Sequence, residues 1–174
     1  MTIDGKDLQT TKQGSVKGLW GHKFKSAGLR YEIGINIKLG FICWIMGPFP
    51  CGDWNDFSIF RFCLEYLLEE GERVEADDGY TGGDPDSVVT PSGIRYLDSD
   101  RKHEARGLAR ACHETGNNLL TNFAVLHKTF YHDIEKHGMC FQFCAVLLEL
   151  VSLELGTKNL FDVSRAYSNM NGPE

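Results

Sequence analysis

Three acidic residues on three different expected elements could together carry out chemistry on a phosphodiester. Asp4 ends a short expected strand, Asp77 follows an expected strand over residues 73–76, and Glu114 lies on an expected helix. Hydrolysis with two Mg²⁺ ions needs carboxylate oxygens from separate elements, because the carboxylates hold the metals while the metals activate water and stabilise the leaving oxygen. The chain has 24 acidic and only 18 basic residues, so this spacing is not specific by itself. Surface acids at the ends of elements are the competing interpretation.

The elements that must position these acids follow a mixed α/β pattern. Alternating apolar residues predict a half-buried strand over 30–38, and the β-rich run over 41–46, stopped by Gly47 and Pro48, completes an antiparallel hairpin. Apolar residues at spacings of three and four predict three helices, at about 57–71 with a cap at Asp53 or Asn55, at 98–114 and at about 131–155. Gly, Asp, Pro and Ser predict an irregular loop up to Gly93. The pattern favours a mixed sheet flanked by helices.

Length and composition limit the class of protein. At 174 residues the chain fits one domain, and 42% hydrophobic with 24% charged residues is typical of a globular protein. The net charge of −6 argues against binding nucleic acid by bulk charge, so any DNA contact has to come from local basic patches. No apolar run reaches the roughly 20 residues that cross a bilayer, and no apolar signal region follows Met1. We therefore expect a soluble protein of the nucleus or cytoplasm that is not secreted and has no membrane partner.

The six cysteines lie at irregular positions, which indicates a reducing compartment rather than a disulfide framework. Cys140 and Cys144 lie four residues apart near His137, so one helix face could offer soft ligands to a metal. A free cysteine on an apolar helix face is more often a small core residue. The core interpretation is therefore preferred for both cysteines.

A set of short sequence words, in a fixed order along most of the chain, resembles a known family. The words are Gly21-His22-Lys23-Phe24-Lys25, Gly28-Leu29-Arg30-Tyr31-Glu32-Ile33-Gly34, Trp44-Ile45-Met46-Gly47-Pro48-Phe49-Pro50-Cys51-Gly52, Val74-Glu75-Ala76-Asp77-Asp78-Gly79-Tyr80, Ala111-Cys112-His113-Glu114-Thr115 and Phe130-Tyr131-His132-Asp133-Ile134-Glu135-Lys136-His137. Together they are similar to the catalytic domain of eukaryotic DDE-superfamily transposases, the Harbinger-like endonucleases. The ordered set is more specific than any one word.

The resemblance implies an RNase H-like α/β fold, with an endonuclease domain over residues 1–163 and a polar tail over 164–174. It also implies that Asp4, Asp77 and Glu114 hold a divalent metal, Mg²⁺ or Mn²⁺, and that the protein cuts transposon-end DNA and supports strand transfer. Only three residues precede Asp4, so we expect a truncated first strand. No helix–turn–helix precedes Asp4 either, which favours a separate DNA-binding subunit.

Four basic residues are candidates for contact with the DNA backbone. Lys23 and Lys25 stand in a family word before a strand, and Arg106 and Arg110 lie along the helix that carries Glu114. A solvated basic turn is the competing interpretation for the two lysines. An exposed charged helix face is the competing interpretation for the two arginines.

Two positions depart from the family pattern and favour a different function. Asp78 adds a negative charge beside Asp77, which could compete for metal or repel phosphate. Thr121 stands where the family carries a lysine, and the loss of a basic residue lowers affinity for DNA. The alternative function is a catalytically inactive, transposase-derived module that binds a metal or a partner. A further alternative is a domain expressed from a fragmentary element with no selected role.

Overall fold

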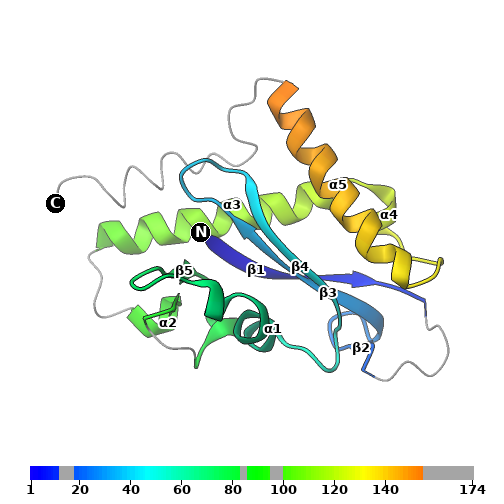
Figure 1. The fold of residues 1–174 in the computed structure, drawn as a ribbon, viewed down its shortest axis with the longest axis horizontal. Helices are drawn as coiled ribbons and strands as arrows, with labels where there is room; N and C mark the ends of the chain where they lie inside the picture. Colours follow the sequence, from blue (N-terminus) through cyan, green and yellow to red (C-terminus); the bar gives the residue numbers. More distant parts are fainter. Residues whose placement is uncertain (12–17, 83–85, 95–99, 155–174) are drawn as a thin grey trace.

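A mixed sheet forms the centre of the molecule, as the sequence predicts (Figure 1). The computed structural model describes residues 1–11, 18–82, 86–94 and 100–154, so the expected tail over 164–174 lies outside the described residues. The strands are β1 (Thr2–Gln9), β2 (Trp20–Gly21), β3 (Ser26–Ile35), β4 (Ile42–Pro50), β5 (Val74–Glu75) and β6 (Val88–Val89). β1 is antiparallel to β3 on one side and parallel to β5 on the other. β3 also pairs with β2 and β4, and β5 pairs with β6.

Helices connect and cover these strands. They are α1 (Asp56–Cys63), the 3-10 helices η1 (Glu65–Leu67) and η2 (Asp78–Tyr80), α2 (Pro91–Ile94), α3 (Asp100–Leu120), α4 (Ala124–His127) and α5 (Glu135–Glu154). Within the described ranges, no helix combines the length and the apolar character that a membrane crossing needs. The described cysteine side chains are Cys43, Cys51, Cys63, Cys140 and Cys144, and all five are free thiols.

The first strand is complete, so the expectation of a truncated strand that ends at Asp4 is wrong. β1 is eight residues long and pairs with β3 along its whole length, from Thr2 opposite Ile35 to Gln9 opposite Gly28. The residues after Asp4 have low strand propensity, and their pairing in the sheet overrides it. Asp4 therefore lies inside a paired strand, where its backbone is fixed.

The hairpin of β3 and β4 is confirmed, with two corrections. β4 continues to Pro50, past the expected stop at Gly47 and Pro48. Prolines are tolerated in such a strand when it lies at a sheet edge, where no further strand needs their missing N–H groups. β3 is buried on both faces instead of half-buried, and even Glu32 is 0% exposed. β3 ends at Ile35, and of the polar residues in its pattern Glu32 is buried and Arg30 is half-buried.

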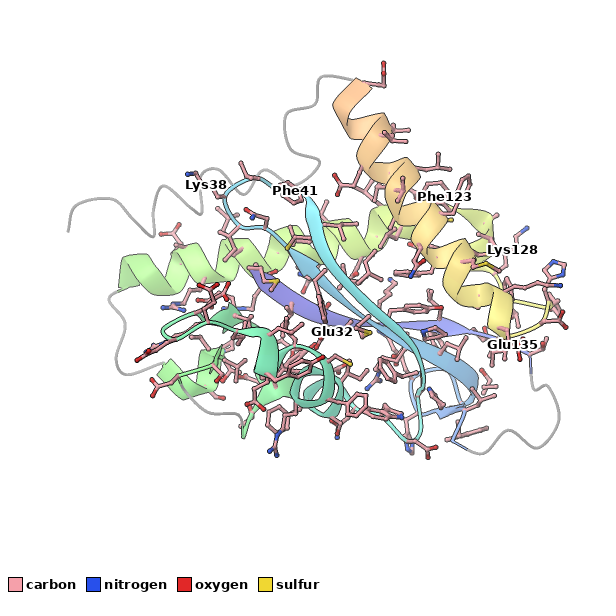
Figure 2. The ribbon with its side chains drawn as sticks, viewed as in Figure 1. Glu32, Lys38, Phe41, Phe123, Lys128 and Glu135 are labelled. Atoms are coloured by element: carbon pink, nitrogen blue, oxygen red, sulfur yellow. The ribbon has the colours of Figure 1, made fainter. Side chains whose placement is uncertain are left out.

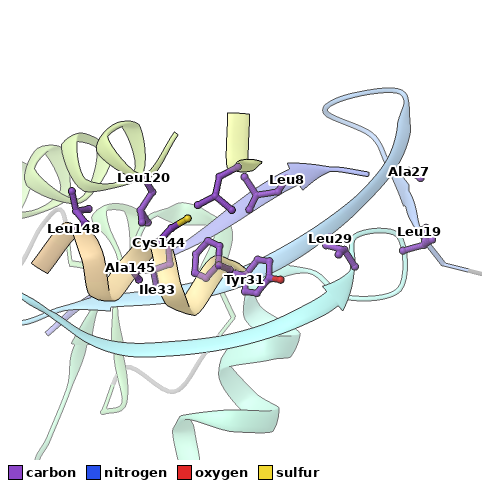
Figure 3. Close-up of a cluster of buried hydrophobic side chains, with 12 residues drawn as sticks. Leu8, Leu19, Ala27, Leu29, Tyr31, Ile33, Leu120, Cys144, Ala145 and Leu148 are labelled. Atoms are coloured by element: carbon purple, nitrogen blue, oxygen red, sulfur yellow. The ribbon is translucent and has the colours of Figure 1, made fainter. Parts of the chain in front are cut away.

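Two separate apolar cores cover the two faces of the sheet. The α5-side core contains Leu8, Leu19, Ala27, Leu29, Tyr31, Ile33, Leu120, Leu126, Phe141, Cys144, Ala145 and Leu148. Figure 3 shows Cys144, Ala145 and Leu148 of α5 packed with Leu120 over the β3 residues Tyr31 and Ile33. The α1-side core contains Ile3, Phe60, Leu64, Val74, Ala76, Tyr80 and Val88. Since alternate strand residues point to opposite faces, β1 contributes Leu8 to the first core and Ile3 to the second.

Several element boundaries differ from the expected ones. α1 ends at Cys63, well before Gly71, and η1 replaces its last part. α3 continues to Leu120, six residues beyond Glu114, because Asn117 and Leu120 are buried against the rest of the molecule. The expected loop after Asp77 contains η2, β6 and α2. The expected strand over 73–76 and the Asn55 cap are confirmed: the Asn55 side chain accepts a hydrogen bond from the Ser58 backbone nitrogen.

Candidate metal and phosphate site

Asp4 and Asp77 lie side by side because their strands are parallel neighbours. Thr2 of β1 lies opposite Glu75 of the parallel strand β5. Two residues further along each segment, the same register brings Asp4 next to Asp77. Asp77 follows the end of β5, and its Oδ1 accepts a hydrogen bond from the Gly79 backbone nitrogen at 2.8 Å, which caps η2. The strand register and this cap together fix where the two carboxyl groups can be.

α3 brings the third predicted acid, Glu114, to the same place. Two side-chain hydrogen bonds dock this helix on β1, and they lie on either side of Glu114 in the sequence. His113 Nδ1 is 2.6 Å from Thr2 Oγ1, and Asn117 Nδ2 donates to Asp4 Oδ2 at 2.7 Å. Residues four apart on a helix share a face, so His113 and Asn117 hold that face against β1. Glu114 is exposed beside them.

All three predicted acids line one open cleft of about 770 Å³. Its lining residues are Asp4, Gly5, Lys6, Asp7, His22, Lys23, Arg30, Cys51, Gly52, Asp53, Asn55, Asp56, Asp77, Glu114, Asn117 and Asn118. A smaller cavity of about 180 Å³ beside α3 is lined by Thr2, Ile3, Asp4, Asp77, Arg110, His113 and Glu114. The acids therefore stand together at the edge of a space that is large enough for a polar ligand.

Negative charge is concentrated at this point of the cleft. Burial, followed by the charges of Asp77 and Asp56, raises the pKa of Asp4 to about 6, against an ordinary value of 3.8. Burial also raises the pKa of Asp56, although the positive charge of Arg30 opposes the shift. Groups of like charge that face each other favour the protonated form, and a bound cation would relieve the repulsion. The site favours a cation electrostatically.

The donor types suit a hard divalent metal, but the side chains do not converge on one point. Within the described part of the chain, no group of three His, Cys, Asp or Glu side chains could hold a metal ion as the side chains stand. Asn117 Oδ1 is a buried acceptor without a hydrogen-bond partner among the described residues. Carboxylate and amide oxygens are the ligands that Mg²⁺ and Mn²⁺ prefer. A metal held by Asp4, Asp77 and Glu114 would therefore require these side chains to turn towards it.

The four predicted DNA contacts divide into two groups. Lys23 lines the cleft and Arg110 lines the smaller cavity. Lys25 is exposed and lines neither, and it occupies a left-handed backbone conformation with φ of 54°. Arg106 is half-buried and forms an ion pair with the buried Glu75. Its guanidinium group is therefore engaged inside the fold, which contradicts the competing interpretation of an exposed charged helix face, and contact of Arg106 with DNA stays a prediction.

Asp78 does not add its charge to the cleft, contrary to the expectation from its position beside Asp77. It lines neither cavity. Its Oδ1 accepts a hydrogen bond from the Ser92 backbone nitrogen at 2.9 Å, and hydrogen bonds from Ser92 hold the pKa of Asp78 below its ordinary value. Asp78 therefore joins η2 to the start of α2.

The soft-ligand alternative at His137, Cys140 and Cys144 is not assembled as a metal site among the described residues. His137 is buried, and its Nδ1 is 2.7 Å from the Tyr31 hydroxyl oxygen. Cys144 belongs to the α5-side core, and Cys140 is half-buried. The preferred interpretation of Cys144 as a core residue is confirmed.

The sequence alone did not point to Asp56 or Asn117. Asp56 follows the Asn55 cap and lies directly over Gly5, where an added Cβ would stand 1.7 Å from Asp56 Oδ1. A side chain at position 5 would therefore collide with Asp56, which explains why a glycine follows Asp4. Asn117 could have been found by its spacing, since it lies three residues after Glu114 and shares its side of the helix.

Comparison with protein-family models, with curated proteins and with solved structures finds no match to this chain. The shape and the charge of the cleft therefore carry the functional argument.

Proposed function

We propose that this protein is a transposase-derived, divalent-metal-dependent DNA endonuclease with an RNase H-like fold. One observation carries the proposal: Asp4, Asp77 and Glu114, from β1, the end of β5 and α3, line one cleft. Acids from separate elements that line one cleft are an arrangement that suits metal-dependent phosphodiester cleavage. The mixed sheet with a core on each face supports the proposed fold.

The residues of the cleft have distinct proposed roles. Asp4, Asp77 and Glu114 would hold Mg²⁺ or Mn²⁺, and the metal would activate water or a 3′-hydroxyl and stabilise the leaving oxygen. Asn117 keeps the Asp4 carboxyl group oriented through its 2.7 Å hydrogen bond. The Gly79 backbone nitrogen does the same for Asp77. The proposed substrate is transposon-end DNA, with a separate subunit that recognises its sequence.

A second candidate function is a catalytically inactive, transposase-derived module that binds a metal or a partner. The observation that favours it is that no three metal-binding side chains converge among the described residues. In such a module the cleft would keep its charge but would not place a phosphodiester for attack. The two candidates differ in whether DNA is cut.

Nicking of supercoiled plasmid in Mg²⁺ or Mn²⁺, with metal titration by calorimetry, separates these functions. We expect wild type to nick the plasmid. Asp77→Asn should lower the nicking activity by at least roughly 10- to 100-fold, which is the loss caused by removing an outer-shell partner of a metal ligand. Asp133→Asn is the matched control, since Asp133 is an exposed acid outside the cleft. Metal binding that depends on Asp77 without any nicking would favour the inactive module. A folded wild type that neither binds metal nor nicks would exclude the endonuclease.

A further inference from the structure

Lys6 is a half-buried cation beside the three acids. It lies on β1 two residues after Asp4, so both side chains leave the same face of the sheet. It lines the cleft, and it forms no ion pair with an acidic side chain of the described chain. Arg30 also lines the cleft, but Asp7 and Asp56 both lie within ion-pair distance of its guanidinium group. Asp4 and Asp7 attract the Lys6 ammonium group. Lys6 differs from Arg30 because no described acid lies within ion-pair distance of it, so the ammonium group can still meet a ligand.

Lys23 adds a second cation from the turn between β2 and β3. It is exposed and lines the same cleft. Lys6 lies within electrostatic reach of Lys23 as well as of Asp4 and Asp7. Two like charges near one another in a partly buried space cost free energy, and a bound anion would offset that cost.

The neighbouring charges indicate what kind of anion fits. Acids and lysines line the same cleft, so it offers oxygen ligands to a cation and ammonium groups to an anion. A nucleic acid backbone matches this pattern, because one phosphate can meet the metal while an adjacent phosphate meets the lysines. Lysine binds phosphate as a point charge and needs no fixed geometry.

We propose that Lys6 and Lys23 form a phosphate subsite that binds a DNA backbone phosphate adjacent to the one being cut. This inference rests on the proposed endonuclease function. Lys6 sets the position of the subsite because β1 fixes its backbone, whereas Lys23 approaches from a turn. The subsite therefore orients the DNA strand relative to Asp4.

The test measures affinity for a labelled DNA duplex by fluorescence anisotropy, in EDTA, over a range of NaCl concentrations. We expect Lys6→Gln and Lys23→Gln each to weaken binding about five- to tenfold at low salt, and each to reduce the slope of log K against log salt by about one. Lys6→Arg keeps the charge and should bind as wild type does. Lys128→Gln is the matched control, because Lys128 is exposed and lies outside the cleft at the end of α4 (Figure 2).

The outcomes separate this inference from the proposed function. Weaker binding by the two glutamine variants, with no plasmid nicking by wild type in any metal, would support the subsite and exclude the endonuclease. Nicking by wild type with unchanged DNA affinity in both glutamine variants would overturn the subsite alone. Absence of DNA binding by wild type at low salt would also overturn it. Circular dichroism melts check that Lys6→Gln is folded. If Lys6→Gln is unfolded, Lys23→Gln still tests the subsite, because Lys23 is exposed.

Discussion

The two acids Asp4 and Asp7 lie three residues apart on one strand, yet their surroundings are opposite. Asp7 is paired: Arg30 Nε lies 2.6 Å from Asp7 Oδ1, and Arg30 Nη2 donates to Asp7 Oδ2 at 2.8 Å. Asp4 accepts neutral hydrogen bonds, from the Asn117 side chain and the Gly5 backbone, and faces the negative charges of Asp77 and Asp56. Both acids line the cleft. One half of the cleft is therefore neutralised within the fold, and the other half is not.

This difference separates structural acids from functional ones. A bidentate pair with arginine uses the carboxylate fully and leaves little for a ligand. An acid whose pKa is raised by burial and by other acids weakens the fold at neutral pH, and a cation bound beside it would offset that cost. The predictions below test whether the two halves differ in this way.

The largest expected effect is the loss of stability in Asp7→Asn. This change leaves the half-buried Arg30 without its main partner, and breaking a buried pair typically costs about 3–5 kcal/mol. Asp4→Asn removes a repelled charge and should not lower the free energy of unfolding. Urea unfolding at pH 7 measures both variants beside wild type. Equal losses in the two variants would contradict the division of the cleft into two halves.

Glu32 extends the comparison to a buried acid that has no cationic partner among the residues the structure describes. Figure 2 labels Glu32 in the interior, where its Oε1 accepts a hydrogen bond from Trp44 Nε1 at 3.0 Å. Burial raises the pKa of Glu32 from 4.5 to about 7, and the charge of Asp56 adds to the shift. The raised pKa contributes stability that is fully present below pH 4.5 and is lost as the pH rises through 7.

The variant that tests this is Glu32→Gln, which cannot ionise. At pH 8 its free energy of unfolding should exceed that of wild type by about 3 kcal/mol. This follows from the rise in the Glu32 pKa from 4.5 to about 7, at about 1.36 kcal/mol per pKa unit. The difference should disappear at pH 4. Urea unfolding of both proteins between these two pH values gives the curve. A difference that does not change with pH would show that Glu32 keeps an ordinary pKa.

Mg²⁺ should bind at the unpaired acids around Asp4 and Asp77 and thereby stabilise the protein. With a Kd of about 1 mM, 10 mM Mg²⁺ adds about 1.4 kcal/mol of stability, which raises the Tm of a chain of this size by about 4 °C. Asp77→Asn should lose the increase, and the exposed Asp133→Asn should keep it. Thermal melts by circular dichroism with and without Mg²⁺ measure it. If Mg²⁺ raises the Tm of Asp77→Asn by the same amount, the metal binds at a site that does not include Asp77.

The smallest expected effect is at the start of α1, which carries Asp56, an acid that lies near both Arg30 and Asp4. Asn55→Ala removes the side-chain acceptor of the Ser58 backbone nitrogen at 2.7 Å, and the loss of such a cap costs about 1 kcal/mol. Asn55→Asp keeps an acceptor and should lose less stability than the alanine variant. Urea unfolding ranks the two. Equal losses of unfolding free energy in the two variants would mean that the side chain at position 55 does not stabilise the start of α1 by accepting this hydrogen bond.

Local signals predicted a substantial part of the fold. The alternating residues of β3, the cap at Asn55 and the strand before Asp77 depend on neighbours in sequence, and the structure contains all three. The length of β1 was not predictable from its residues, because pairing with β3 along its whole length determines it. The acids of the cleft could be selected only through the family resemblance, since the chain contains 24 acidic residues. Their catalytic role stays a prediction.

The sequence by itself determined the mixed α/β class and the order of most elements, because periodicity and caps act over a few residues. Only the tertiary structure decided which acids are neutralised. Asp7 meets Arg30 across two strands, whereas Asp4 meets Asp77 across a parallel pair. It likewise decided that Glu32 is buried, since cores cover both faces of β3. Charge compensation depends on residues far apart in the chain, and local sequence carries no signal for such contacts.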